Sequence, residues 1–146
     1  MPLRTSSAEW KGTLRAGSGT LRVGTGLWEG AYSFGSRFED EPGTNPEELL
    51  AAAHAACFSM ALSGLLEDSG YQPRSIRTTA SVSLNKTEGA YRIREVRLVT
   101  EADVAEIDDE TFLKLAEQAR ANCPVSVALC GVAISVEASL SEVAHA

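Results

Sequence analysis

The chain has 146 residues, 44% of them hydrophobic and 23% charged, and its 20 acidic and 13 basic side chains give a net charge of −7 at pH 7. This length suits one globular domain with a substantial core, so we expect a single domain over residues 1–146. The acidic balance argues against nucleic acid and anionic membrane surfaces as partners, because both attract basic proteins.

The N-terminus lacks the apolar stretch of a signal peptide. No apolar run approaches the roughly 20 residues that cross a bilayer, so we expect no membrane association. Three cysteines without a secretion signal indicate a reducing compartment, where a disulfide is more often catalytic or transient than structural. We therefore expect a cytoplasmic protein.

The first 40 residues are rich in glycine, threonine and aromatic side chains. Short runs separated by glycines predict three strands of a meander, with the sequences EWKGTLRAG, GTLRVGTG and GAYSFGSRF. Arg37, in GSRFED, follows the last of these strands, next to the long apolar segment that comes after it.

A long helix is predicted to begin at Asn45. This residue suits the N-cap, Pro46 suits the first helical position, and Glu48 completes a capping-box pattern. Residues 49–66 are apolar or small on nearly every side, so we expect a helix that is buried all round. Because one small sheet covers only one side of a helix, we expect a homodimer in which a second copy supplies the other cover.

Two strands are predicted next. Residues 76–84 alternate apolar and polar side chains, which is typical of a half-buried strand. A hairpin turn at residues 86–89 leads into a second strand over 91–100. Its alternation changes phase between Ile93 and Val96, which predicts a β-bulge.

A second helix is predicted to begin at Asp108 or Asp109 and to stop near Asn122, because the residue before Pro124 avoids helical geometry. Its apolar face consists of Phe112, Leu115, Ala116 and Ala119. The segment 127–140 is apolar and β-branched enough to close a sheet. This order of elements indicates an α+β fold, with helices segregated from a mainly antiparallel sheet.

The three cysteines differ in their surroundings. Cys57, in AAAHAACFSMAL, is open to two interpretations, a small packed side chain or a reactive thiol. Cys123, in ANCPVS, lies where Pro124 can open a further helical turn, and a thiol at a helix N-terminus favours the thiolate. Cys130 is interpreted as an ordinary strand residue.

The only histidines are His54 and His145, and the sequence contains no C-x-x-C motif, so we expect no metal site. His54 precedes Cys57 by three residues and could share a helix face with it. A Cys–His pair is typical of a thiol hydrolase. No third group that would orient the histidine is identifiable from the sequence.

Arg37, Glu47 and Glu48 are the charged candidates for a site. Glu47 and Cys57 are ten residues apart, which corresponds to about 15 Å along a straight helix. Two arrangements would bring them together. Glu47 could precede the helix in a bent segment, or it could reach the thiol of a partner chain.

Three segments taken together, GSRFED, GTNPEELLAAAHAACFSMAL and ANCPVS, resemble the OsmC/Ohr family of thiol peroxidases, and the OsmC branch in particular. The resemblance implies the OsmC-like fold and an intertwined homodimer, with the long helices between sheets and the active site at the subunit interface. It also implies the reduction of hydroperoxides, preferably organic ones, to alcohols.

Matched by position, the resemblance implies that Cys57 is the peroxidatic thiol and Cys123 the resolving thiol, which condense to a Cys57–Cys123 disulfide. It implies an orienting pair of Arg37 with a glutamate, taken as Glu47 although Glu48 is adjacent. No catalytic role comes to His54 or Cys130. No cofactor or metal is implied, and recycling requires an external dithiol, for which the resemblance suggests a lipoyl-bearing protein.

Two other functions remain open from the residues. One is a thiol hydrolase that uses Cys57 and His54. The other is a non-catalytic dimer that binds an apolar ligand against the long helix, with its thiols incidental. The sequence leaves open the natural hydroperoxide, the physiological reductant, the oxidation of Cys130 and the order of the C-terminal tail.

Overall fold

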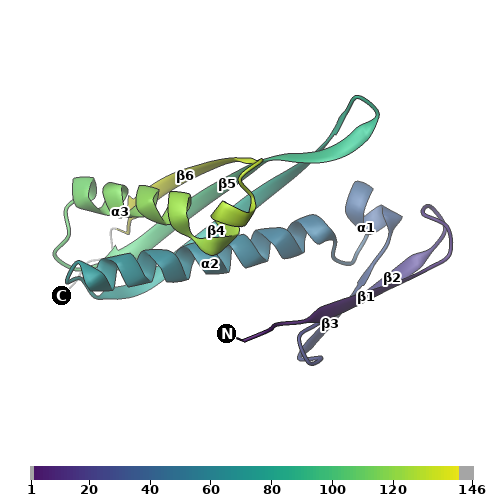
Figure 1. Cartoon of the computed structure of the whole chain (residues 1–146), viewed down its shortest axis with the longest axis horizontal. Coiled ribbons are helices and arrows are strands. Elements are labelled where there is room, and N and C mark those ends of the chain that lie inside the picture. The colour runs from purple at the N-terminus through teal and green to yellow at the C-terminus, as the bar shows by residue number, and fades with distance from the viewer. Residues whose placement is uncertain (1, 142–146) are drawn as a thin grey trace. The chain divides into compact units, whose positions relative to one another are not determined.

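The computed structural model describes residues 2–141 and divides the chain into two compact units, Met1–Leu49 and Leu50–Ala146. Both units contain a small sheet of three strands together with helices, which confirms the α+β class (Figure 1). The assignment of all 146 residues to a single domain stays a prediction.

The first unit contains the expected meander. Its strands pair antiparallel in the order β1-β2-β3. The strand bounds are β1 Ser6–Lys11, β2 Ser18–Val23 and β3 Trp28–Tyr32. Gly19 of the central strand pairs with Trp10 on one side and Tyr32 on the other, and the two rings lie 5.3 Å apart. A Cβ at Gly19 would overlap both rings, so glycine permits this aromatic contact across the sheet.

A short helix, α1 (Phe34–Phe38), follows β3, where the sequence had predicted a continuing strand. The chain turns at Ser33 because Ser33 and Ser36 form a reciprocal capping box. The Ser36 amide donates to Ser33 Oγ at 3.0 Å, and the Ser33 amide donates to Ser36 Oγ at 2.8 Å. Arg37 therefore lies on a helix rather than after a strand.

The long helix α2 (Pro46–Asp68) begins as predicted. The Glu48 amide donates to Asn45 Oδ1 at 2.8 Å, and the Asn45 side-chain amide donates to Glu48 Oε1 at 2.7 Å. The glutamate thus completes the cap through the asparagine side chain rather than through its backbone. The helix is followed by Gly70, whose φ of +90° suits glycine.

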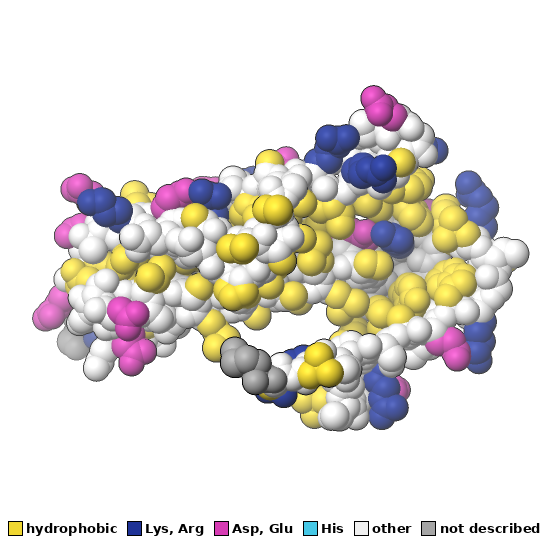
Figure 2. Space-filling view, in the orientation of Figure 1, with side chains coloured by type: hydrophobic (Ala, Val, Ile, Leu, Met, Phe, Trp, Pro, Cys, Tyr) yellow, Lys and Arg dark blue, Asp and Glu magenta, His cyan; other side chains and the backbone are white. Residues whose placement is uncertain are grey.

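One copy of the chain buries one face of α2, and burial on all sides with a second copy as the other cover stays a prediction. The fully buried side chains of α2 recur every fourth residue, at His54, Phe58, Leu62 and Leu66, whereas Met60 is 77% exposed. Figure 2, in the orientation of Figure 1, shows hydrophobic side chains at the surface along α2 and α3. Much apolar helix surface is therefore uncovered in one copy.

By length and composition alone, α2 is also long and apolar enough to cross a membrane. This corrects the expectation that no segment reaches that limit, because alanines between the larger apolar side chains keep the whole segment apolar. The core helix of a soluble protein passes the same test.

The second sheet has the order β4-β5-β6. Its strands are β4 Pro73–Thr87, β5 Ala90–Val104 and β6 Ala133–Leu140. The hairpin and its bulge are confirmed, since Ser83 pairs with Glu95 while Leu84 pairs with Ile93, leaving Arg94 as the extra residue. The pairing of β5 with β6 is parallel, contrary to a wholly antiparallel sheet, because two helices return the chain to the starting edge between these strands.

Those helices are α3 (Asp109–Asn122) and α4 (Pro124–Ala128). Asp108 caps α3, and the four predicted apolar residues are the buried ones. They join a core with Phe58 of α2 and alternate residues of β5, among them Val96 and Leu98. The final strand begins later than predicted, because α4 occupies 124–128. Cys130 consequently lies exposed in a turn rather than in a strand.

Candidate functional site

Arg37 and Glu47 form an ion pair in the first unit. Arg37 Nη2 lies 2.8 Å from Glu47 Oε1, and Arg37 Nε lies 3.2 Å from Oε2. This two-point contact fixes the plane of the guanidinium. Glu47 is only 8% exposed and lies in the first turn of α2, where the helix dipole favours a carboxylate. The neighbouring Glu48 is engaged by Asn45, so Glu47 is the partner of the arginine.

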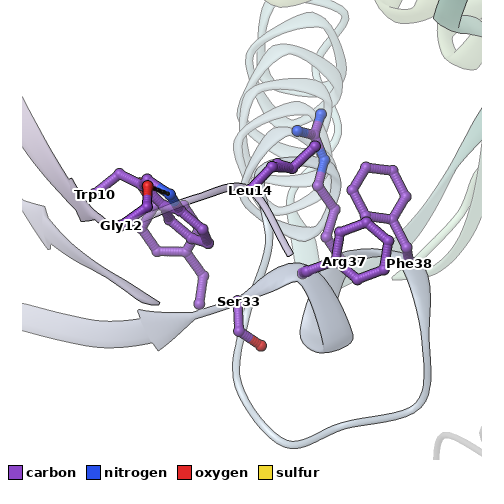
Figure 3. Close-up of a pocket in the computed structure, with 8 residues that line it drawn as sticks. Trp10, Gly12, Leu14, Ser33, Arg37 and Phe38 are labelled. Atoms are coloured by element: carbon purple, nitrogen blue, oxygen red, sulfur yellow. Dashed lines mark hydrogen bonds between the residues drawn. The ribbon is translucent and has the colours of Figure 1, made fainter. Parts of the chain in front are cut away.

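A pocket of about 390 Å³ opens beside Arg37 within the same unit (Figure 3). Its lining residues are Trp10, Gly12, Leu14, Tyr32, Ser33, Phe34, Arg37 and Phe38. Figure 3 shows the rings of Trp10 and Phe38 on opposite sides of the pocket. The Arg37 guanidinium carbon lies 5.3 Å from the centroid of the Phe38 ring. The pocket thus combines aromatic walls with one cation, which suits a ligand with an apolar body and a polar head.

Cys57 and Cys123 lie together in the second unit. Both thiols are free, Cys57 half-buried on α2 and Cys123 fully buried at the N-cap of α4. Burial raises the pKa of Cys57. The Val125 backbone N–H lowers it by donating to the sulfur, and the hydrogen bond and charge of Cys123 raise it further. Cys123 is therefore a close neighbour of Cys57, and the surroundings of Cys57 favour its neutral thiol.

The surroundings of Cys123 agree with the prediction that Pro124 opens a helical turn. Pro124 occupies the first turn of α4, and the amide of Ser126 donates to Cys123 Sγ at 3.4 Å. Ser126 Oγ lies 3.1 Å from the same sulfur. Ser126 was not among the predicted site residues, although its place three residues after the N-cap Cys123 makes it a cap partner.

His54 is directed elsewhere than the sequence suggested. Its Nε2 forms a 2.8 Å hydrogen bond with Ser126 Oγ, and burial lowers the pKa of this histidine. The groups that shift the pKa of Cys57 are Val125 and Cys123, and His54 is not among them. The Cys57–His54 pair required by a thiol hydrolase is therefore not formed.

Glu47 and Cys57 lie ten residues apart on the same helix, α2. This helix is continuous from Pro46 to Asp68, so no bent segment precedes it at Glu47. Ten residues of helix span about 15 Å between Glu47 and Cys57. Within one helix, the carboxylate does not reach the thiol.

Among residues 2–141, no three His, Cys, Asp or Glu side chains gather in an arrangement that could hold a metal ion. His145 and most of the C-terminal tail lie outside the described residues.

Comparison with known proteins adds to this geometry. A family model described as OsmC-like protein matches residues 38–139. Peroxiredoxin OsmC of Escherichia coli K12 is 47% identical over 127 residues, which cover 86% of this chain and 89% of that protein.

Solved structures resemble the whole chain. The crystal structure of the organic hydroperoxide resistance protein OhrB of Bacillus subtilis has a TM-score of 0.74 at 28% identity, covering 92% of this chain and 98% of that one. An OsmC protein of Legionella pneumophila has a TM-score of 0.71 at 25% identity, covering 97% and 99%. With a family model that matches most of its length and a relative of this identity, the chain belongs to the OsmC-like protein family.

Proposed function

We propose that this protein is a two-cysteine peroxidase that reduces organic hydroperoxides to alcohols. The observation that carries the proposal is the pair of free thiols in the second unit, Cys57 and Cys123, of which Cys123 is close enough to raise the pKa of Cys57. Two such thiols can exchange two electrons with a peroxide by forming one disulfide. The names of the relatives, a peroxiredoxin and an organic hydroperoxide resistance protein, support the same chemistry.

In the first step, the Cys57 thiolate attacks one oxygen of the O–O bond. The S–O bond forms as the O–O bond breaks, and the departing alkoxide takes a proton to become the alcohol. Cys57 is left as a sulfenic acid, oxidised by two electrons. Only the thiolate performs this attack, so the raised pKa of Cys57 must be countered.

Arg37 is the group that we assign to this task. A guanidinium near the sulfur favours the thiolate and donates to the peroxide oxygens as charge grows on the leaving alkoxide. Because Glu47, its partner, is about 15 Å along the helix from Cys57, the arginine reaches the thiol of a second copy. The uncovered apolar surface of α2 supports the same homodimer, since a second copy would remove it from water.

The pocket beside Arg37 supports an organic substrate. Its aromatic walls would contact an alkyl or aryl group while the guanidinium receives the peroxide. A small hydrated peroxide would leave those walls unfilled. We therefore propose a preference for bulky organic hydroperoxides, with hydrogen peroxide as a poorer substrate.

In the second step, Cys123 condenses with the sulfenic acid of Cys57. A disulfide forms and water leaves, which protects Cys57 from irreversible oxidation. Recycling then needs two electrons from an external dithiol, because the remaining cysteine, Cys130, is a single thiol in an exposed turn. A lipoyl-bearing protein in the cytoplasm is our proposed reductant.

The first test is a thiol count with intact mass, before and after one equivalent of cumene hydroperoxide. We expect the loss of two thiols and of about two mass units, with peptide mapping to a Cys57–Cys123 link. Cys130→Ser is the matched control and should give the same loss. Three unchanged thiols in the native protein would contradict the proposal.

A second candidate function is a dimer that binds an apolar ligand without chemistry. The aromatic pocket beside Arg37 favours it, because such a pocket needs no thiol to bind. Under that function, an apolar alcohol would bind while both thiols stay inert to hydroperoxide. The thiol count separates the two candidates.

A further inference from the structure

A buried row of three side chains connects α2 with α4. His54 Nε2 lies 2.8 Å from Ser126 Oγ, and Ser126 Oγ lies 3.1 Å from Cys123 Sγ. His54 and Cys123 are no more than 1% exposed, and Ser126 is 5% exposed. Neither the attack of Cys57 on peroxide nor the Arg37 pair uses this row. A buried imidazole hydrogen-bonded to a serine beside a thiol therefore requires its own explanation.

The direction of these hydrogen bonds follows from the other nitrogen of the imidazole. His54 Nδ1 is buried and has no hydrogen-bond partner among the described residues. In protein interiors an unpaired acceptor is more common than an unpaired N–H. The proton of the neutral ring therefore belongs on Nε2, which donates to Ser126 Oγ. Burial lowers the pKa of His54, which keeps the ring neutral.

Ser126 then has one proton left to give. Because its oxygen accepts from His54, its hydroxyl proton is free to point at Cys123 Sγ. The Ser126 backbone N–H donates to the same sulfur at 3.4 Å. One residue thus offers two donors to one sulfur, an arrangement that stabilises a thiolate more than a thiol.

We propose that His54 is a positioning residue for Cys123: it orients the Ser126 hydroxyl toward the sulfur, so that Cys123 attacks the sulfenic acid of Cys57 as a stabilised thiolate. This inference rests on the proposed peroxidase function and adds two residues, His54 and Ser126, to its second step.

The chemistry of that step balances without another reagent. Cys123 gives up its thiol proton, and the two hydrogen bonds from Ser126 support the thiolate that remains. The thiolate sulfur attacks the Cys57 sulfur, the S–S bond forms, and the S–O bond breaks. The departing hydroxide takes the proton that Cys123 released and leaves as water, so one sulfenic acid and one thiol become one disulfide.

Few other ionisable groups face Cys123. On α2 these are His54, Cys57 and Asp68, the last lining the same hollow of about 500 Å³ as Cys123. Helix α4 carries none, and on α3 Arg120 pairs with Glu117 and donates to the Ile134 carbonyl. The buried side chains of the sheet are apolar apart from Thr100, whose hydroxyl is not ionised near neutral pH. A change in Cys123 titration on altering His54 would therefore be transmitted through Ser126.

The test measures how Cys123 titrates in the reduced full-length protein. In a parent carrying Cys57→Ser and Cys130→Ser, the ultraviolet absorbance of the thiolate reports Cys123 alone. We expect His54→Leu or Ser126→Ala to lower the thiolate fraction of Cys123 about tenfold at a fixed pH below its pKa. If both variants titrate like the parent, the proposal is overturned.

Conservative variants distinguish orientation from packing. His54→Gln keeps an N–H donor near the position of Nε2, and Ser126→Thr keeps the hydroxyl, so both should restore most of the thiolate fraction. Ser59→Ala is the matched control, because it removes a 2.7 Å hydroxyl hydrogen bond to Thr78 from the same helix. A Ser59→Ala effect as large as that of His54→Leu would overturn the proposal.

A kinetic measurement links the row to the second step. In otherwise native protein, single-turnover oxidation followed by rapid alkylation gives the rate of disulfide formation. His54→Leu should slow it about three- to tenfold below the thiol pKa, since lost thiolate is partly offset by greater nucleophilicity. The slowing should shrink as pH rises, and a pH-independent slowing would overturn the proposal. If the proposed peroxidase function were wrong, the native protein would form no disulfide with peroxide. The titration of Cys123 needs no peroxide and therefore tests the role of His54 independently.

Discussion

The two compact units of this chain differ in the charge of their candidate site residues. The first unit keeps a guanidinium and a carboxylate, Arg37 and Glu47, in a two-point contact beside an aromatic pocket. The second unit places two thiols among apolar side chains and raises the pKa of Cys57. The thiol that we propose as the nucleophile is thus separated along the sequence from the guanidinium that we propose as its activating charge. Both thiols of the proposed redox pair belong to the second unit, whereas the cation that we propose to favour the Cys57 thiolate belongs to the first.

The largest expected effect comes from removing the nucleophile. Cys57→Ser should abolish hydroperoxide reduction, because the serine hydroxyl is not ionised at neutral pH and does not replace a thiolate. The measurement is hydroperoxide consumption with a dithiol reductant. Cys130→Ser, which alters the exposed turn, should retain full activity. If the two variants lost the same fraction of peroxidase activity, Cys57 would not be the specific nucleophile.

Removing the activating charge should cost less. Arg37→Ala is expected to slow oxidation of Cys57 about a hundredfold, the usual effect of losing one donor to a developing oxyanion. Stopped-flow oxidation with cumene hydroperoxide measures this rate. Arg22→Ala is the control, because Arg22 pairs with Glu29 at 3.5 Å on the exposed meander of the same unit. If the two arginine variants behave alike, the first unit does not activate the thiol.

Substitutions of the neighbouring Glu47 and Glu48 should have different effects. Glu47→Gln weakens the two-point contact and should slow oxidation about tenfold. Glu48→Gln should leave the rate unchanged and cost about 0.5–1 kcal/mol of unfolding free energy, since Glu48 contributes to the helix cap. Paired rate measurements and thermal unfolding decide between these outcomes. A kinetic defect in Glu48→Gln alone would reverse the assignment.

Cys123→Ser tests how the second thiol affects the first. After burial, the hydrogen bond and charge of Cys123 raise the pKa of Cys57, so the substitution should lower that pKa. More thiolate then exists at a given pH below the pKa, and oxidation of Cys57 should accelerate about twofold to threefold. The sulfenic acid should persist and convert to sulfinic acid, measured by mass. If the pH at which the oxidation rate rises were higher in Cys123→Ser than in the native protein, Cys123 would not be a cause of the raised Cys57 pKa.

A further expected effect concerns the choice between substrates rather than the overall rate. Trp10→Ala enlarges the aromatic pocket and should reduce the preference for cumene hydroperoxide over hydrogen peroxide about tenfold. The rate with hydrogen peroxide should change little, because a small peroxide leaves the aromatic walls uncontacted. Trp28→Ala, at an exposed aromatic residue of the same sheet outside the pocket lining, is the control. A uniform loss on both peroxides would mean that the pocket does not select the substrate.

Local signals in the sequence predicted local structure well. The Asn45 cap, the Asp108 cap and the bulge near Arg94 all follow from short patterns and are confirmed. The helix at Ser33 was missed because serine caps compete with the strand tendency of the aromatic residues around them. The parallel β6 was missed because strand direction depends on a crossover that no local pattern marks.

The candidate site divides in the same manner. Cys57 and Cys123 were identified by their sequence contexts and by resemblance, and the structure brings them together. The Arg37–Glu47 contact was implied by resemblance and is observed. The hydrogen bond of His54 was not predicted, because its partner Ser126 lies 72 residues away in sequence. Such a pairing depends on how α2 packs against the chain that follows it.

The length of α2 has a consequence for the activity of dimers that contain two different variants. If each functional site combines Arg37 of one copy with Cys57 of another, two inactive variants can complement each other. A dimer of one Arg37→Ala chain and one Cys57→Ser chain contains one site with both native groups and one site with neither. Co-refolding the two variants should therefore regenerate activity that neither has alone. Catalysis would then depend on dimer formation, because about 15 Å of helix separates Glu47 from Cys57 within one chain.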